Sequence, residues 1–266
     1  MTGLVVEHIF TQNDFNRFAA LSGDANPIHV DASFAARTRF GRTVAHGVLL
    51  ETILRGMADR LAPGQRVMEQ ALRFSAPTFA DEPMRFEVAA EKVDADQLRL
   101  ALRISRASDG TLTCDGHMVL AGSATLLPDL TAKPAASASF APSPPGPLEY
   151  GMTAGLSRGF SLDDVTACTA LGGPAPAPGM VPEPLIGALF STLLGMDLPG
   201  IGTNYLKQET TYHAAACTGE PLSARVEITG LRLEKNLVDL STICHGADGR
   251  LIADGRALVY VRDVKR

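Results

Sequence analysis

Asp24 and His29 are the residues of this chain whose types and spacing best suit acid–base chemistry. They lie in residues 22–29, which read Ser-Gly-Asp-Ala-Asn-Pro-Ile-His. An imidazole with an ordinary pKa of about 6.5 and a nearby carboxylate can share one water molecule and move its protons. Pro27 fixes its own φ and pushes Asn26 away from helical angles. The sequence therefore predicts a rigid, non-regular overhang from Asp24 to His29.

A short helix is predicted directly before this segment, over residues 11–21. Thr11 is a preferred capping residue, and Phe15 and Phe18 recur at the helical interval. Gly23 then ends the helix, so the overhang begins at a defined point.

The chain after residue 47 has the pattern of one long helix followed by strands. Apolar residues between positions 48 and 61 fill a broad helical stripe, which predicts a central helix. Strand-like runs follow near 67–74, 84–93, 98–105 and 111–125, separated by turn signals such as Asp109-Gly110. One helix followed by a run of strands indicates an α+β fold.

Two sequence blocks resemble the signature of the (R)-specific enoyl-thioester hydratases, also called MaoC-like dehydratases. In that family Gly-Asp, any residue, Asn-Pro, an aliphatic residue and His occur in this order, as they do at residues 23–29. A His-Gly pair then opens a long apolar helix, here His46-Gly47. The resemblance implies a hotdog fold, in which an antiparallel sheet wraps around a central helix and carries the Asp and His on an overhang.

The same resemblance implies the reaction. Asp24 and His29 would form the catalytic dyad that adds water to a trans-2-enoyl thioester and gives a (3R)-hydroxyacyl product, or runs the reverse dehydration. Water held between the two groups would deliver its oxygen and its proton to one face of the alkene, which is syn addition. Gly47 is the expected oxyanion donor, because its N–H is unsatisfied within the helix and the helix dipole favours negative charge there.

Three further residues are expected near the substrate. Asn26 would orient the overhang, and His46 would close the start of the central helix or touch the substrate. Thr52 lies where many family members carry a serine, although a threonine on a helix often bonds to the preceding turn instead.

Arg37, Arg39 and Arg42 stand within six residues of a predicted connecting loop. Their guanidinium groups suit the phosphates of a coenzyme A or phosphopantetheine carrier. The alternative is an ordinary solvated loop. Apart from coenzyme A or an acyl carrier protein as the carrier of the acyl thioester, no cofactor and no metal are expected.

Proline, alanine and serine dominate residues 126–149, a composition that spaces folded units. We therefore predict a catalytic hotdog domain over 1–127, a linker over 128–149 and a second hotdog domain over 150–266. The second domain repeats the first, since residues 160–165 echo residues 10–15 at an offset of 150. The two would pair as a pseudo-dimer.

The second copy lacks the catalytic segment. The repeat offset falls from 150 to 136 between residues 173 and 198, and Pro174 stands in the place of Asp24. Glu183-Pro184 is expected to replace the His-Gly pair. We therefore expect one active site per chain, with the second half serving structure and the acyl pocket, which would be lined by apolar residues of its central helix: Leu185, Ile186, Leu193 and Leu194.

Composition excludes several function classes. The 266 residues carry a net charge of -5 and no lysine-rich run, which argues against nucleic-acid binding. The four cysteines are dispersed, so buried free thiols are expected rather than a zinc site or disulfides. No apolar run approaches the roughly 20 residues of a membrane span, and no signal sequence is evident, so the expected location is cytoplasmic. A homodimer of double-hotdog chains is possible.

Two other functions compete with hydration. A hotdog thioesterase would hydrolyse the thioester and release free thiol. A non-catalytic acyl-thioester binder would leave the Asp24 and His29 pair idle.

Overall fold

The computed structural model describes residues 3–93, 97–121, 147–175 and 177–264. Most of the predicted linker, residues 128–146, lies outside the described residues. The domain boundaries at 127 and 150 therefore remain a prediction.

The helices and strands fall into two successive sets, as the repeat predicts. The first set is β1 (Gly3–Ile9), α1 (Gln12–Ser22), α2 (Pro27–Val30), α3 (Ala32–Ala35), α4 (Gly47–Leu61), β2 (Arg66–Phe74), β3 (Pro83–Val93), β4 (Gln97–Arg106) and β5 (Leu112–Ala121). The second set is β6 (Thr153–Arg158), α5 (Leu162–Ala170), β7 (Met180–Val181), α6 (Glu183–Thr192), the π-helix η1 (Leu193–Asp197), β8 (Asn204–Tyr212), β9 (Ala216–Cys217), β10 (Leu222–Arg232), the 3-10 helix η2 (Leu233–Lys235), β11 (Leu237–His245) and β12 (Leu251–Tyr260).

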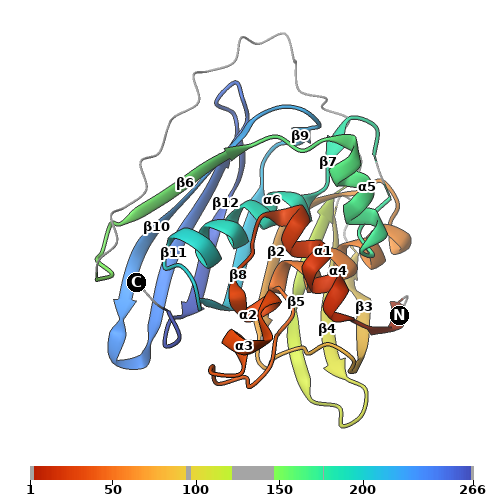
Figure 1. Ribbon diagram of the computed structural model, residues 1–266. Helices are drawn as coiled ribbons and strands as arrows, with labels where there is room; N and C mark the ends of the chain where they lie inside the picture. The colour runs from red at the N-terminus through yellow and green to blue at the C-terminus, as the bar shows by residue number, and fades with distance from the viewer. Residues whose placement is uncertain (1–2, 94–96, 122–146, 176, 265–266) are drawn as a thin grey trace.

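Ten strands form one antiparallel sheet that curves around α4 and α6 (Figure 1). The strand order is β1-β3-β4-β5-β2-β8-β12-β11-β10-β6. Each half contributes five strands in the same internal order, and the halves meet where β2 pairs with β8. The predicted α+β class and the paired hotdog units are confirmed.

The two central helices pack against each other inside the curved sheet, and most of α4 is buried. Gly56 of α4 faces the chain of the second half, where a Cβ added to it would lie 2.1 Å from the Gly172 carbonyl oxygen. A side chain at this position would force the halves apart. Apolar side chains from both halves form one shared core.

Capping fixes where α1 begins and ends, as predicted. Thr11 and Asp14 form a capping box, and Gly23 closes the helix with a φ of 90°. In the second half, Ser161 and Asp164 form the same capping box at the start of α5.

Three details differ from the sequence predictions. Strand β1, at one edge of the sheet, was not predicted. The overhang is not wholly irregular, because Asn26 caps a single helical turn, α2, in which Pro27 occupies the favoured first position. The central helices begin after His46 and Pro182, so Pro182 and Glu183, rather than Glu183 and Pro184, take the places of the His-Gly pair.

All four cysteines are buried free thiols, as expected. No helix in the described ranges combines the length and apolarity that crossing a membrane requires.

Candidate active site

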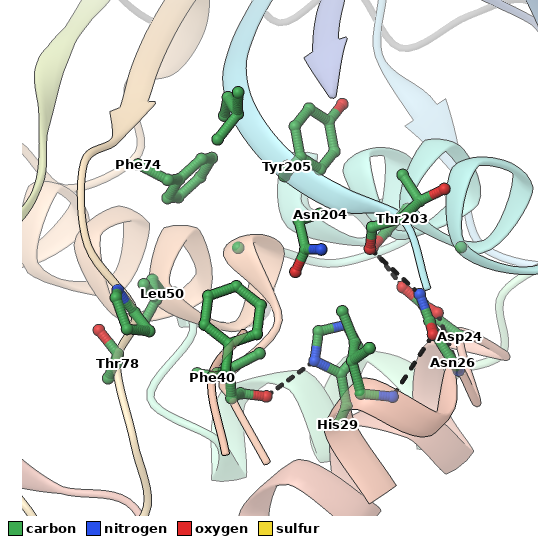
Figure 2. Close-up of a pocket in the computed structure, with 18 of the residues that line it drawn as sticks. Asp24, Asn26, His29, Phe40, Leu50, Phe74, Thr78, Thr203, Asn204 and Tyr205 are labelled. Carbon is green, nitrogen blue, oxygen red and sulfur yellow. Dashed lines mark hydrogen bonds between the residues drawn. The ribbon is translucent and has the colours of Figure 1, made fainter. Parts of the chain in front are cut away.

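A cavity of about 410 Å³ opens where the two halves of the sheet separate. Strands β2 and β8 pair from Glu69 opposite Thr211 to Arg73 opposite Lys207. Beyond that point residues 74–79 diverge from residues 203–206, and both stretches line the cavity. Figure 2 shows Asp24, Asn26 and His29 on one side of this space and Asn204 and Tyr205 on the other.

Asp24 lies directly after the left-handed Gly23 and is 2% exposed. Its Oδ2 accepts a hydrogen bond of 2.6 Å from Ser191 Oγ, and its Oδ1 accepts one of 3.2 Å from the Asn26 backbone N–H. Burial raises the pKa of Asp24, while His29, Ser191 and Asn26 oppose that rise. Ser191 comes from α6 of the second half, and the sequence analysis did not single it out.

His29 lies on α2 with its tautomer fixed by the backbone. Its Nδ1 is 2.7 Å from the Val44 carbonyl oxygen, which can only accept, so Nδ1 carries the proton. Burial lowers the pKa of His29 from its ordinary 6.5, and Asp24 opposes that change. In the neutral ring Nε2 is therefore an unprotonated acceptor, as a general base requires.

His46 packs against His29 and hydrogen-bonds to the backbone of Asp24. Its ring stacks on His29 with centroids 3.7 Å apart, and its Nε2 donates to the Asp24 backbone carbonyl at 2.9 Å. Burial, with His29 beside it, lowers the pKa of His46 well below 6.5. His46 does not line the cavity, so its contacts favour the structural role that the sequence analysis left open.

Asp24, His29 and His46 offer ligand atoms within 4.8 Å of one another. His29 Nδ1 and His46 Nε2 are already bonded to backbone carbonyls. Asp24 and His29 line the cavity and His46 does not, so Asp24 and His29 Nε2 are the pair best placed to hold a small ligand such as water.

Asn26 ties the overhang to the second half. Its Nδ2 donates to the Thr203 carbonyl at 3.2 Å, and its Oδ1 accepts from the Gly202 N–H at 3.0 Å. This side chain thus positions Asp24 and His29 against residues that are 176 or 177 positions away in the chain.

Gly47 opens α4 at the cavity wall, and no acceptor among the described residues takes its N–H. A Cβ added to Gly47 would lie 2.9 Å from Phe74 Cζ. A side chain at this position would collide with Phe74, so the residue whose N–H lies at the positive end of the helix is a glycine.

The π-helix η1 makes room for the carboxylate. A Cβ added to Gly195 would lie 2.5 Å from Asp24 Oδ1, which is too close for any side chain. Single π-turns occur often at functional sites. Of the apolar residues predicted for the acyl pocket, Leu194 lines the cavity, whereas Leu185, Ile186 and Leu193 lie in the core, which corrects that prediction.

Thr52 does not line the cavity, because it lies buried and its hydroxyl donates to the Val48 carbonyl at 2.8 Å. Of the three predicted arginines, Arg39 lines the cavity. Arg37 lies over the Phe34 ring, and Arg42 pairs with Glu82.

The symmetry-related gap in the second half is filled. Arg55 Nε donates to Glu183 Oε2 at 2.9 Å, and the Val67 N–H donates to Glu183 Oε1 at 3.2 Å. With the central helices aligned, Glu183 corresponds to Gly47 and Arg55 to Ser191. A largely buried ion pair therefore occupies the places that Gly47 and Ser191 take in the first site.

The chain is similar in sequence to named hydratases and dehydratases. The protein-family model described as the MaoC like domain matches residues 4–103. An (R)-specific enoyl-CoA hydratase from Aeromonas caviae is 36% identical over 111 residues, which cover 41% of this chain and 79% of that protein. A 3-hydroxybutyryl-CoA dehydratase from Methylorubrum extorquens is 28% identical over 118 residues, covering 44% of this chain and 75% of that protein.

Two solved structures match nearly the whole chain and show the fold. A MaoC-like dehydratase aligns with a TM-score of 0.73 at 14% identity, covering 97% of both chains. A conserved hypothetical protein from Mycobacterium tuberculosis with a double hotdog fold aligns with a TM-score of 0.75 at 14% identity, covering 98% of this chain and 96% of that one. The two solved structures show that the chain folds as a double hotdog, and the match to the Aeromonas hydratase establishes that it belongs to the MaoC-like dehydratase family.

Proposed function

We propose that this protein hydrates trans-2-enoyl thioesters to (3R)-hydroxyacyl thioesters, or catalyses the reverse dehydration. The observation that carries the proposal is the meeting of Asp24 and the unprotonated Nε2 of His29 at the wall of one cavity that also contains the free N–H of Gly47. The named relatives, a hydratase and a dehydratase, support the same reaction class.

The proposed step uses one water molecule held between His29 and Asp24. His29 Nε2 takes a proton from this water as the oxygen bonds to Cβ of the substrate. The electron pair of the double bond moves toward the thioester oxygen, where the Gly47 N–H stabilises the developing charge. A proton from the Asp24 carboxyl completes the product at Cα, and the proton on His29 then returns to Asp24.

Two opposite pKa shifts support this assignment of acid and base. Burial favours the neutral, protonated form of Asp24 and the neutral, unprotonated form of His29. Ser191 holds the carboxyl group in place at 2.6 Å. Its role is to position Asp24.

Arg39 is the arginine best placed to meet the carrier. It lies exposed at the cavity, with its guanidinium stacked on Phe40 at 4.7 Å and on Tyr260 at 4.2 Å. Its fork of donors suits the phosphate that coenzyme A and an acyl carrier protein share on their pantetheine arms. Arg39→Ala should therefore weaken binding of an acyl-CoA. Arg37→Ala is the matched control, because Arg37 does not line the cavity.

A panel of trans-2-enoyl-CoA substrates of increasing acyl length tests the function. We expect the conjugated enoyl absorbance to disappear without release of free thiol, and Asp24→Asn and His29→Ala to slow this by orders of magnitude. Release of thiol would instead establish the thioesterase alternative. Binding of the panel without any turnover would leave the non-catalytic binder.

A further inference from the structure

Asn204 presents an unused hydrogen-bonding group to the cavity from the second half of the chain. It is 5% exposed and lies at the first position of β8. Its Nδ2 donates to the Gly202 carbonyl at 3.0 Å, which fixes the orientation of the amide. Its Oδ1 has no partner among the described residues, and Figure 2 shows the amide projecting into the cavity toward His29 and Phe40.

Asn204 is linked by its neighbours to Arg39 on one side of the cavity and to the overhang on the other. It is the cross-strand partner of Tyr260, the residue on which Arg39 stacks. It also follows Thr203, whose carbonyl accepts the hydrogen bond from Asn26 on the overhang. Asn204 therefore lies between the arginine proposed for the carrier phosphate and the overhang that carries the dyad.

A ligand that spans these two points must place its connecting arm beside Asn204. In a phosphopantetheine thioester this arm contains two secondary amides, which provide N–H donors for an acceptor in the wall. The Asn204 Oδ1 is open to the cavity rather than enclosed by protein, so a donor in the cavity can reach it, and water takes this hydrogen bond when no ligand is bound. An amide N–H of the arm replaces this water.

We propose that Asn204 is a specificity-determining residue that accepts a hydrogen bond from an amide of the pantetheine arm. The inference rests on the proposed function, because it takes the ligand to be an acyl thioester of a pantetheine carrier. Asn204 would thus select for the pantetheine arm of the carrier and would not distinguish one acyl chain from another. The counterpart in the first half is Arg66, at the first position of β2, and its guanidinium has no free acceptor and donates to the His213 carbonyl.

Binding of saturated, unreactive thioesters tests this inference separately from turnover. Ligand-observed NMR titrations would compare S-butyryl-pantetheine, which has both amides, with S-ethyl thiobutyrate, which has none. We expect Asn204→Leu to weaken binding of the pantetheine ligand about tenfold and to leave the ethyl thioester unchanged. Arg39→Ala is the paired control, because it should weaken S-butyryl-CoA without affecting S-butyryl-pantetheine.

Equal weakening of both ligands, or weakening of neither, would overturn the role of Asn204. If Asn204→Leu does not fold, the wild-type protein answers the question with S-butyryl-pantetheine methylated at both amide nitrogens. This ligand should bind about tenfold more weakly than its parent, and equal affinity would refute the inference. A wild-type protein that binds these ligands as expected but hydrates no enoyl thioester would refute the proposed function alone.

Discussion

Glu51, a fully buried carboxyl group on α4, should make the stability of this protein depend on pH. Gln208 Nε2 donates to its Oε2 at 2.9 Å, and Gly187 of α6 faces it, with an added Cβ 3.3 Å from that oxygen. Burial raises the pKa of Glu51 from 4.5 to about 7, and the nearby Glu183 adds to the rise. The perturbation is Glu51→Gln, which keeps the shape of the side chain and removes the titration.

The expected magnitude follows from this pKa. A folded-state pKa above the unfolded value means that the folded protein binds the extra proton, so stability is complete below pH 4.5 and falls as pH rises through 7. The gap between 4.5 and about 7 corresponds to about 3 kcal/mol of unfolding free energy. Relative to the wild type, Glu51→Gln should therefore gain about 3 kcal/mol between pH 4.5 and pH 8.

Urea unfolding of both proteins at several pH values between 4.5 and 8 measures this difference. Subtracting the two free energies at each pH cancels the contributions of the titrating groups that do not interact with Glu51. Glu7→Gln, on the exposed side of edge strand β1, controls for the loss of one surface carboxylate. A constant difference between Glu51→Gln and the wild type at all pH values would refute the reasoning.

Three further predictions concern the site. Ser191→Ala removes the 2.6 Å hydrogen bond to Asp24, so it should lower kcat about 10- to 100-fold with little change in the Kd of a saturated thioester. An equal loss in binding would show that Ser191 contacts the substrate instead. The acid limb of the kcat/KM profile for hydration should lie below pH 6.5, because burial lowers the pKa of His29, and a limb above 6.5 would contradict its role as base. Calorimetric titration with a saturated acyl-CoA should saturate at one ligand per chain, because Arg55 and Glu183 fill the second gap, and two per chain would disprove this division.

Local sequence signals predicted much of the fold. The capping pattern at Thr11 and the end of the helix at Gly23 depend on neighbouring residues, and the structure confirms both. The stripe of α4 and the strands after it likewise follow from periodicity. The short turn α2 was missed because Asn-Pro was taken to exclude a helix, whereas proline is favoured at the first helical position.

The site could be predicted only on its first-half side. Asp24 and His29 stand in one short motif, but Ser191 and Asn204 reach the cavity from more than 160 residues away. No local pattern marks a lone serine on an apolar helix, or an asparagine at the start of a strand, as part of a site. The internal repeat offered one signal for Ser191. When the two central helices are aligned, Ser191 takes the position that the buried Arg55 has in the first half.

The central claim is that Asp24 and His29 act together on one water at one face of the substrate. Hydration of the best enoyl-CoA of the panel in D₂O tests it most directly, with the product analysed by NMR for configuration at C3 and for deuterium at C2. We expect a (3R) product with deuterium in the single C2 configuration that syn addition generates. A (3S) product, or a mixture of C2 configurations formed during addition, would contradict the claim.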